Sequence, residues 1–245
     1  MQPFKPLRLQ ELGLSKHRID IWQFPLDIDF NGARSILTLE EQQRADRFYF
    51  AKHQQHFTIA RAMLRIILAA YLNTPRQQLA FAYNPQGKPY LESKTHIEFN
   101  LSHSGSLALL AIGQNYPVGI DLENFSARPY LGIGQQIFSA KENQQLQQIK
   151  TYLKPIGFFH LWAQKEALIK ACGLGLSYPT KQFDLSLLPP ADNFLVDPKY
   201  QRPWRIRSFT PKIACCAAIC HHPDITDIRY LSLQPTECES LYENI

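Results

Sequence analysis

Apolar residues recur at helical spacing along the segment HFTIARAMLRIILAAYL. They stand at Ile59, Met63, Ile66, Ile67 and Ala70, positions that share one face of a helix. A proline follows shortly after this run, and the residue before a proline disfavours helix. The spacing therefore predicts a long helix that packs on a core along one side.

A shorter helix precedes it. Thr38 followed by Glu41 matches the capping-box pattern at the start of EEQQRADRF. Two further helical segments are predicted at 135–150 and 156–172.

Strand-like runs accompany both helical blocks. IDIWQF reads as a first strand, FAYNPQGKPYL as two strands around a turn, and IEFNLSHSGSLALLAIG as two strands joined by a polar loop at Ser102 to Ser106. NYPVGIDLEN predicts a turn and a strand, and WRIRSF, IACCAAIC and IRYLSL predict strands in the tail. The chain therefore reads as α+β with two similar halves, divided near Tyr116 to Gly119.

Composition narrows the class of protein. Of the 245 residues, 45% are hydrophobic and 19% charged, which predicts a globular chain. The net charge of +5 suits an anionic partner such as a nucleotide, a phosphate or an acidic protein, and is too small to indicate nucleic acid. The absence of a leader pattern and of a long apolar run predicts a cytoplasmic protein that does not contact the membrane.

The five cysteines form no C-x-x-C pair, which favours reduced thiols. Cys216 and Cys220, followed by His221 and His222, could belong to a zinc site. We favour a buried strand that uses cysteine as a small hydrophobe, because zinc sites need two well-spaced ligand pairs.

The segment from Gly119 to Glu123, GIDLE, is the first candidate for chemistry. On a strand, Ile120 and Leu122 face the core, and Asp121 and Glu123 share the opposite face. Two neighbouring carboxylates repel unless a cation lies between them, and oxygen ligands suit Mg²⁺. The alternative is an ordinary solvated acidic face.

The second candidate is the helical segment WAQKEALIK. Trp162, Glu166 and Lys170 lie on one face, where Glu166 could add a third oxygen to a metal. Lys165 and Lys170 could reach phosphates. The alternative is a surface Glu166–Lys170 pair, with Trp162 in the core.

The third candidate is NLSHSG. Ser102 and His103 are adjacent, so on a strand they point to opposite sides, and no G-x-S-x-G elbow is present. Contact with a phosphate or nucleotide fits this loop better than a hydrolase nucleophile does. The alternative is a turn rich in serine and glycine.

The three candidate segments, in this order, resemble the motifs of 4′-phosphopantetheinyl transferases of the surfactin-synthetase-activating type. Their patterns are S-H-x-G, G-I-D-L-E and W-x-x-K-E-A-x-x-K. The resemblance extends from about Thr38 to Pro179. It includes a G-K-P turn at Gly87 to Pro89, an F-S-x-x-E helix start at Phe138 to Glu142, and a glycine-rich exit at Gly173 to Leu176.

The resemblance implies a pseudo-dimer of two similar subdomains, 1–117 and 118–245, with the metal site in the second. It implies transfer of 4′-phosphopantetheine from coenzyme A to a serine of an apo acyl or peptidyl carrier protein, in fatty-acid, polyketide or nonribosomal-peptide synthesis, with release of adenosine 3′,5′-bisphosphate. A chain with both halves would act as a monomer.

Site residues follow by match to the family motifs. Asp121, Glu123 and Glu166 would bind Mg²⁺, and Lys165 and Lys170 would contact phosphates of coenzyme A. The remaining contacts to coenzyme A would come from Arg44, Lys52, Thr58, Lys88, Ser102 and His103.

The incoming serine must lose a proton. Glu166, directly or through a metal-bound water, is the expected base, with Glu123 as the rival. The carrier protein would meet a basic surface with an apolar centre at 125–150, which includes Arg128, Lys141 and Lys150.

Three other functions remain open at this point. A metal-dependent phosphohydrolase would need no carrier protein. A non-catalytic binding module would predict a broken acidic set, whereas all three acids are present. A nucleic-acid binder would need a basic motif, and the basic residues are scattered.

Overall fold

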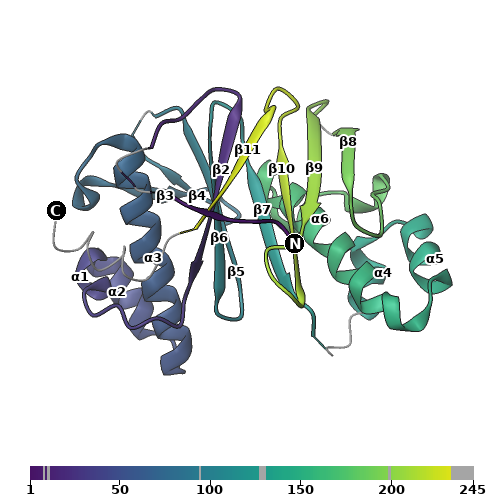
Figure 1. The fold of residues 1–245 in the computed structure, drawn as a ribbon, viewed down its shortest axis with the longest axis horizontal. Helices are drawn as coiled ribbons and strands as arrows, with labels where there is room; N and C mark the ends of the chain where they lie inside the picture. The colour runs from purple at the N-terminus through teal and green to yellow at the C-terminus, as the bar shows by residue number, and fades with distance from the viewer. Residues whose placement is uncertain (8, 10–11, 94, 127–130, 198–199, 233–245) are drawn as a thin grey trace.

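The computed structural model describes residues 1–7, 9, 12–93, 95–126, 131–197 and 200–232. Figure 1 shows two sheets in the middle of the molecule, with the helices of residues 33–72 beyond one and those of residues 131–172 toward the far side of the other. No helix in these ranges is long and apolar enough to cross a membrane.

The first sheet has the strand order β1-β11-β2-β6-β5. β5 pairs antiparallel with β6 and β6 with β2, whereas β11 runs parallel to both β2 and β1. The bounds are β1 Lys5–Pro6, β2 Arg18–Pro25, β5 Ile97–Ser104, β6 Leu107–Gln114 and β11 Asp227–Ser232.

The second sheet is antiparallel, with the order β7-β10-β9-β8. Its strands are β7 Gly119–Asn124, β8 Asp192–Val196, β9 Pro203–Phe209 and β10 Cys215–His221. A separate hairpin pairs β3 (Phe81–Tyr83) with β4 (Pro89–Leu91).

The α-helices carry capping signals at several ends. Thr38 and Ser139 start two of them with complete capping boxes, and Asn73 and Gly173 end the two long ones in the left-handed conformation. The helices are α1 Ala33–Ile36, α2 Leu39–Asp46, α3 Ala51–Leu72, α4 Leu131–Ile137, α5 Ala140–Gln148 and α6 Lys154–Cys172.

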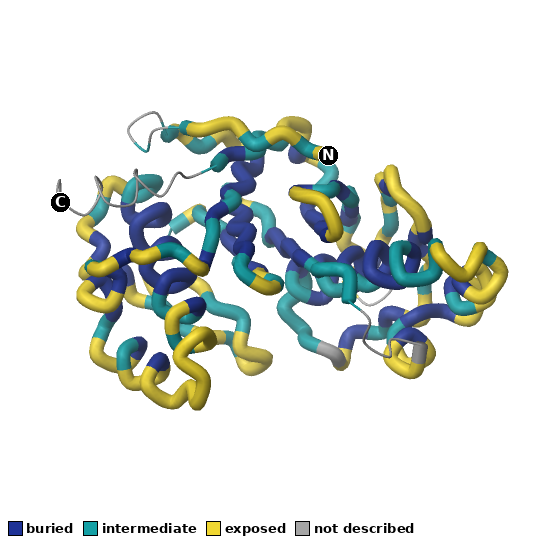
Figure 2. Tube along the Cα trace, turned by 60° about the horizontal axis from the view of Figure 1, so that its bottom comes forward, coloured by how far each residue is buried: buried dark blue, intermediate teal, exposed yellow. Residues whose placement is uncertain are grey.

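Alternation along the strands builds three apolar layers. Trp22, Phe24 and Leu110 face α3, whereas Ile19, Ile21 and their neighbours on β6 face the second sheet. The other side of the second sheet packs on α6. The order is therefore α3, first sheet, second sheet, α6, and Figure 2 shows the buried residues concentrated along these central elements.

The two halves repeat one plan. β2, helices ending in α3, then β5 and β6 in one half correspond to β7, helices ending in α6, then β9 and β10 in the other. In each sheet the first of these strands pairs with the last, and the last with the middle one. The predicted α+β fold of two similar parts is confirmed.

The predicted division at 117/118 falls in the connection between β6 and β7 and stays a prediction. One strand from the C-terminal part of the chain belongs to the first sheet, which the N-terminal part otherwise forms. β11, from the last part of the chain, lies between β1 and β2 in the first sheet.

Two predicted elements differ in extent. The segment expected as one helix at 135–150 forms α4 and α5, because Ser139 takes the N-cap position of a new helix. The loop expected at Ser102 to Ser106 is shorter, because β5 continues through Ser104 before β6 starts at Leu107. Ser102 and His103 therefore lie on a strand.

We expect Gly119→Ala to destabilise the fold by about 3 kcal/mol, the upper end for overpacking. A Cβ atom at position 119 would collide with the carbonyl oxygen of Ala167 and the backbone nitrogen of Ala171, so β7 and α6 would have to separate. Chemical denaturation measures the change. Gly132→Ala is the matched control, since a Cβ atom there meets nothing within 4 Å; equal stability of the two variants would contradict the close packing.

The contribution of His160 to the free energy of unfolding should fall as pH is lowered from about 6.5 toward 4. Burial lowers the pKa of His160 from 6.5 to about 4, so the unfolded chain takes up a proton in this range that the folded chain does not. His160→Phe should reduce the slope of unfolding free energy against pH by up to about 1.4 kcal/mol per unit. Denaturation at several pH values tests this, with exposed His96→Gln as the control; an unchanged slope in His160→Phe would refute it.

Candidate active site

The two halves meet where the side chains of β5 face the edge of β7. On alternate residues of β5, a side-chain oxygen accepts a hydrogen bond from a backbone N–H of β7 located 20 residues further along the chain. The pairs are Asn100 with Ile120 (2.8 Å), Ser102 with Leu122 (3.3 Å) and Ser104 with Asn124 (3.1 Å). This ladder fixes β7, and with it the acidic residues, against the first half.

β7 presents its two acids toward α6, as the alternation predicts. Ile120 and Leu122 lie in the apolar layer between the sheets, so Asp121 and Glu123 point to the opposite face. One oxygen of Asp121, Oδ1, accepts from Ser102 Oγ at 3.1 Å and from Lys170 Nζ at 2.5 Å. Its other oxygen, Oδ2, is buried and has no hydrogen-bond partner.

Glu123 is held by a tryptophan. Trp162 Nε1–H donates to Glu123 Oε1 at 2.9 Å, and its ring stacks on Phe158. Burial and the charge of Asp121 raise the pKa of Glu123 to about 7, against the opposing effects of Trp162 and Lys170. Trp162 was predicted to share a helix face with Glu166 and Lys170, with a core position as the alternative, whereas its hydrogen bond to Glu123 was not predicted.

Glu166 belongs to the same electrostatic group. Burial and the charge of Asp121 raise its pKa, and Lys170 opposes the shift. Within the described ranges, no group of three or more His, Cys, Asp or Glu residues is gathered closely enough to hold a metal ion. Asp121, Glu123 and Glu166 thus interact electrostatically, but their carboxylates do not form a preformed metal site.

A cavity of about 280 Å³ opens beside these acids, between the two halves. It combines three predicted features: Glu166, Lys170 and the G-K-P turn of the β3–β4 hairpin. Its lining residues are Gln86, Gly87, Lys88, Pro89, Asn100, Leu101, Glu166, Ile169, Lys170, Gly173 and Gly175.

Lys165 does not reach this cavity. Its side chain is 0% exposed, and its Nζ donates to the carbonyl oxygens of Thr180 (2.7 Å) and Phe183 (2.9 Å). It also pairs with Glu142 at 3.0 Å. The prediction that Lys165 contacts a phosphate disagrees with this placement, because adjacent helix residues point about 100° apart.

Ser102 and Lys88 serve the framework as well. Ser102 Oγ is shared among Asp121, Lys170 and the amide of Leu122, which leaves it no free position toward a phosphate. Lys88 lines the cavity, but its Nζ donates to the carbonyl oxygens of Val118 and Ala171 at 3.1 and 3.3 Å. It thereby fastens the hairpin to the second half.

His103 points away from Ser102, as expected on a strand, and is exposed. Loss of water around its ring, followed by the charges of His56 and Lys170, lowers its pKa. His103 therefore lies close enough to Lys170 for its pKa to respond to the lysine charge.

The remaining predicted contacts lie on the first half and do not line this cavity. Arg44 is exposed and stacks over the Phe57 ring at 5.2 Å, and Lys52 is exposed on α3. Thr58 Oγ1 donates to the carbonyl of Gln54 and borders a separate cavity.

The cysteines behave as small apolar residues. β10 is buried along its whole length, with Cys216 and Cys220 facing α6 and Cys215 facing the first sheet. The thiols of the described chain are free, and Cys238 lies outside the described residues. The interpretation as a buried strand is confirmed.

Comparison with known proteins agrees with this geometry. Residues 21–115 match the family described as 4′-phosphopantetheinyl transferase, N-terminal, and residues 117–220 match the 4′-phosphopantetheinyl transferase superfamily. The 4′-phosphopantetheinyl transferase HetI of Nostoc sp. is 32% identical over 215 residues, 85% of this chain and 89% of its own.

Two bacillary relatives are similar at comparable length. The 4′-phosphopantetheinyl transferase psf-1 of Bacillus pumilus is 31% identical over 80% of this chain and 85% of its own. The transferase Sfp of Bacillus subtilis is 28% identical over 79% and 86%. The fold and the site thus define a two-part enzyme with an acidic centre between its halves. The chain belongs to the 4′-phosphopantetheinyl transferase family, and the predicted resemblance is confirmed.

Trp162→Phe should lower kcat/KM about 10-fold, because the hydrogen bond that orients the Glu123 carboxylate is lost. The ring is retained, and only the N–H donated to Glu123 is lost. Trp204→Phe is the matched control, because the buried Trp204 Nε1 has no hydrogen-bond partner among the described residues. Steady-state kinetics of both variants decide the matter; equal activities would show that the Trp162 hydrogen bond does not position Glu123.

Proposed function

We propose that this enzyme transfers the 4′-phosphopantetheine group of coenzyme A to a serine of an apo acyl or peptidyl carrier protein, with Mg²⁺. The observation that carries the proposal is the cavity between the halves, where Glu166 and Lys170 face the G-K-P turn beside Asp121 and Glu123. Family membership supports the type of reaction.

The candidate ligand atoms are of the type that Mg²⁺ binds. All the oxygens come from carboxylates, and Asp121 Oδ2 is a buried acceptor with no partner in the protein. Mg²⁺ is commonly held by one or two carboxylates together with waters and substrate phosphates, so a preformed cage of three residues is not required. Asp121, Glu123 and Glu166 would hold the ion, and it would supply positive charge to the pyrophosphate oxygens.

Residues of the chain itself would position the substrate and neutralise its negative charge. Lys170 lies at the cavity with 28% of its side chain exposed, within reach of both Asp121 and an entering phosphate. Transfer to the serine oxygen breaks the bond between the β-phosphorus and the bridging oxygen and releases adenosine 3′,5′-bisphosphate. Such a reaction depends mainly on positioning and on neutralising charge.

Two carboxylates can accept the proton of the serine. The pKa values of Glu166 and Glu123 are both raised by burial and by Asp121, which brings each nearer to neutral pH, where a base works best. Glu166 is our candidate because it lines the cavity, whereas Glu123 Oε1 is engaged by Trp162.

The carrier protein would dock on the second half near 125–150. Lys141 is 65% exposed and pairs with Asp184, and Lys150 lies 6.0 Å over the ring of exposed Tyr152. Cations around an exposed aromatic suit an acidic partner surface. Arg128, also predicted here, lies outside the described residues. We propose a monomeric, cytoplasmic enzyme in a fatty-acid, polyketide or nonribosomal-peptide pathway.

The direct test is the intact mass of an apo carrier protein after incubation with this enzyme, coenzyme A and Mg²⁺. We expect a gain of about 340 Da, the mass of one phosphopantetheine group, which disappears with EDTA and in Asp121→Ala. Full turnover by Glu166→Gln at neutral pH would remove Glu166 as the base.

Several apo carriers should be tried, because carriers differ in sequence around the serine. No mass gain with any of them, together with breakdown of coenzyme A in their absence, would overturn the transferase and indicate a phosphohydrolase.

A further inference from the structure

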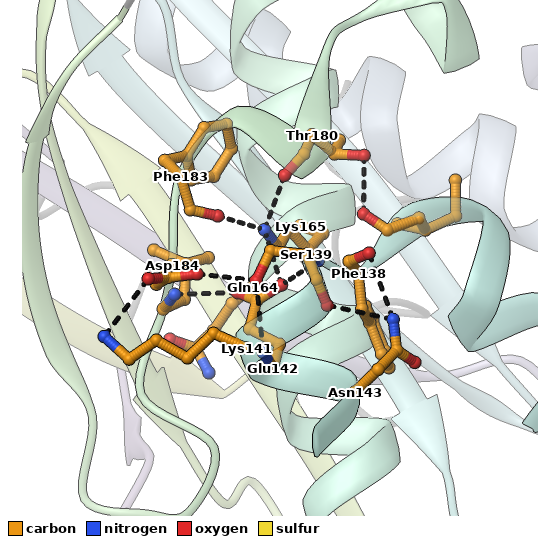
Figure 3. A network of polar contacts seen from close by, with 12 residues as sticks. Phe138, Ser139, Lys141, Glu142, Asn143, Gln164, Lys165, Thr180, Phe183 and Asp184 are labelled. Atoms are coloured by element: carbon orange, nitrogen blue, oxygen red, sulfur yellow. Dashed lines mark hydrogen bonds and ion pairs between the residues drawn. The ribbon is translucent and has the colours of Figure 1, made fainter. Parts of the chain in front are cut away.

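Lys165 is the centre of a buried polar anchor in the second half (Figure 3). Its ammonium group donates to the carbonyl oxygens of Thr180 and Phe183, pairs with Glu142, and lies 4.1 Å from the centre of the Phe183 ring. All these partners come from α5 or from the segment after α6. Lys165 therefore ties α6 to the elements on both sides of it.

Glu142 completes the anchor. Its Oε2 accepts from the backbone N–H of Ser139 at 2.7 Å, as part of the capping box of α5, and its Oε1 accepts from the N–H of Leu185 at 2.7 Å. A carboxylate with 0% exposure is thus bound by two amides and one ammonium group. The charge is satisfied from every side, as a buried ion requires.

The first half contains a similar anchor. Glu41 belongs to the capping box of α2 and pairs with Arg65 of α3 at 2.7 Å. Arg65 Nη1 donates to the carbonyl oxygens of Arg76 and Leu79 at 2.9 and 3.0 Å, and Arg65 lies 5.1 Å from the centre of the Phe81 ring.

The two anchors share four parts, and the first half adds Arg61, which pairs with Glu41 at 2.5 Å and whose equivalent position, four residues before Lys165, is Leu161. Each has a capping-box glutamate, a cation on the next long helix, two carbonyl oxygens of the segment after that helix, and an aromatic ring from the same segment. The glutamate and the cation are 24 residues apart in the first half and 23 in the second.

The next residue on the helix distinguishes the halves. Arg65 is followed by Ile66, which is 1% exposed in the core. Lys165 is followed by Glu166, which lines the cavity between the halves. In the second half, the anchor thus fixes the rotation of the helix turn that carries a site carboxylate.

We infer that Lys165 is a positioning residue, which acts by holding Glu166 toward Asp121 and does not touch the substrate, and that arginine can replace it as in the first half. This inference rests on the proposed role of Glu166. It names a task for Lys165 that differs from the phosphate contact expected from the sequence.

The experiment compares Lys165→Arg, Lys165→Met and Lys170→Met. Three readouts are used: steady-state transfer to a carrier protein, coenzyme A affinity by calorimetry, and Mn²⁺ binding to the free protein by paramagnetic resonance. We expect Lys165→Met to weaken Mn²⁺ binding and kcat about 10-fold while coenzyme A affinity stays within about 2-fold. Lys165→Arg should retain most of the Mn²⁺ affinity and most of kcat. Lys170→Met should weaken coenzyme A binding.

Glu142→Gln provides a second route should Lys165→Met fold poorly. The amide can still accept from Ser139 or Leu185, but the pairing charge is gone, so it should reproduce the loss of Mn²⁺ affinity in a weaker form. Thermal denaturation of each variant checks the fold.

Two results would overturn the inference. One is a Lys165→Met variant that loses coenzyme A affinity about 10-fold with unchanged Mn²⁺ binding, and the other is an arginine variant as impaired as the methionine one. Failure of the proposed function would look different, because the wild-type protein itself would then transfer nothing, while Mn²⁺ and coenzyme A binding would still report on Lys165.

Discussion

The arrangement of the site depends on the contact between β5 and β7, where side chains of β5 accept the hydrogen bonds that backbone carbonyls would accept within a sheet. β5 and β7 are edge strands of different sheets, and the amides of Ile120, Leu122 and Asn124 on β7 would stay unsatisfied if nothing faced them. Short polar side chains of β5 supply the acceptors. Because buried amides without partners are costly, this ladder fixes the relative position of the halves. The acids of β7, the cavity and the hairpin held by Lys88 all follow from that position.

The repeated anchors show how one framework can serve two tasks. In each half a buried glutamate caps one helix and pairs with a cation on the next, so the helical layer is tied together at the same point. In the first half, the residue after the cation, Ile66, lies in the core. The second half places a carboxylate on the following residue. The two halves thus share the structural network and differ in the residue that follows its cation.

Patterns local in the chain were predictable. Thr38 and Glu41 specify a helix start by themselves, because both partners of the capping box lie within four residues. The direction of Asp121 and Glu123 followed from strand alternation alone. The role of Lys165 did not, because its partners Glu142, Thr180 and Phe183 are distant along the chain. A lysine beside a glutamate on a helix gives no sign in the sequence of which partners it will find.

The sequence by itself determined the class of fold, the two-part plan and the common direction of Asp121 and Glu123, since periodicity encodes these directly, and the resemblance to the family led us to expect Glu166 beside them. The tertiary structure decided which polar groups are free for chemistry and which are bound within the framework. Ser102 and Lys165 are buried and held by partners on other elements, whereas Lys170, which pairs with Asp121, keeps 28% of its side chain exposed at the cavity. The physical reason is that a buried polar group must find a partner, and only packing shows where that partner lies.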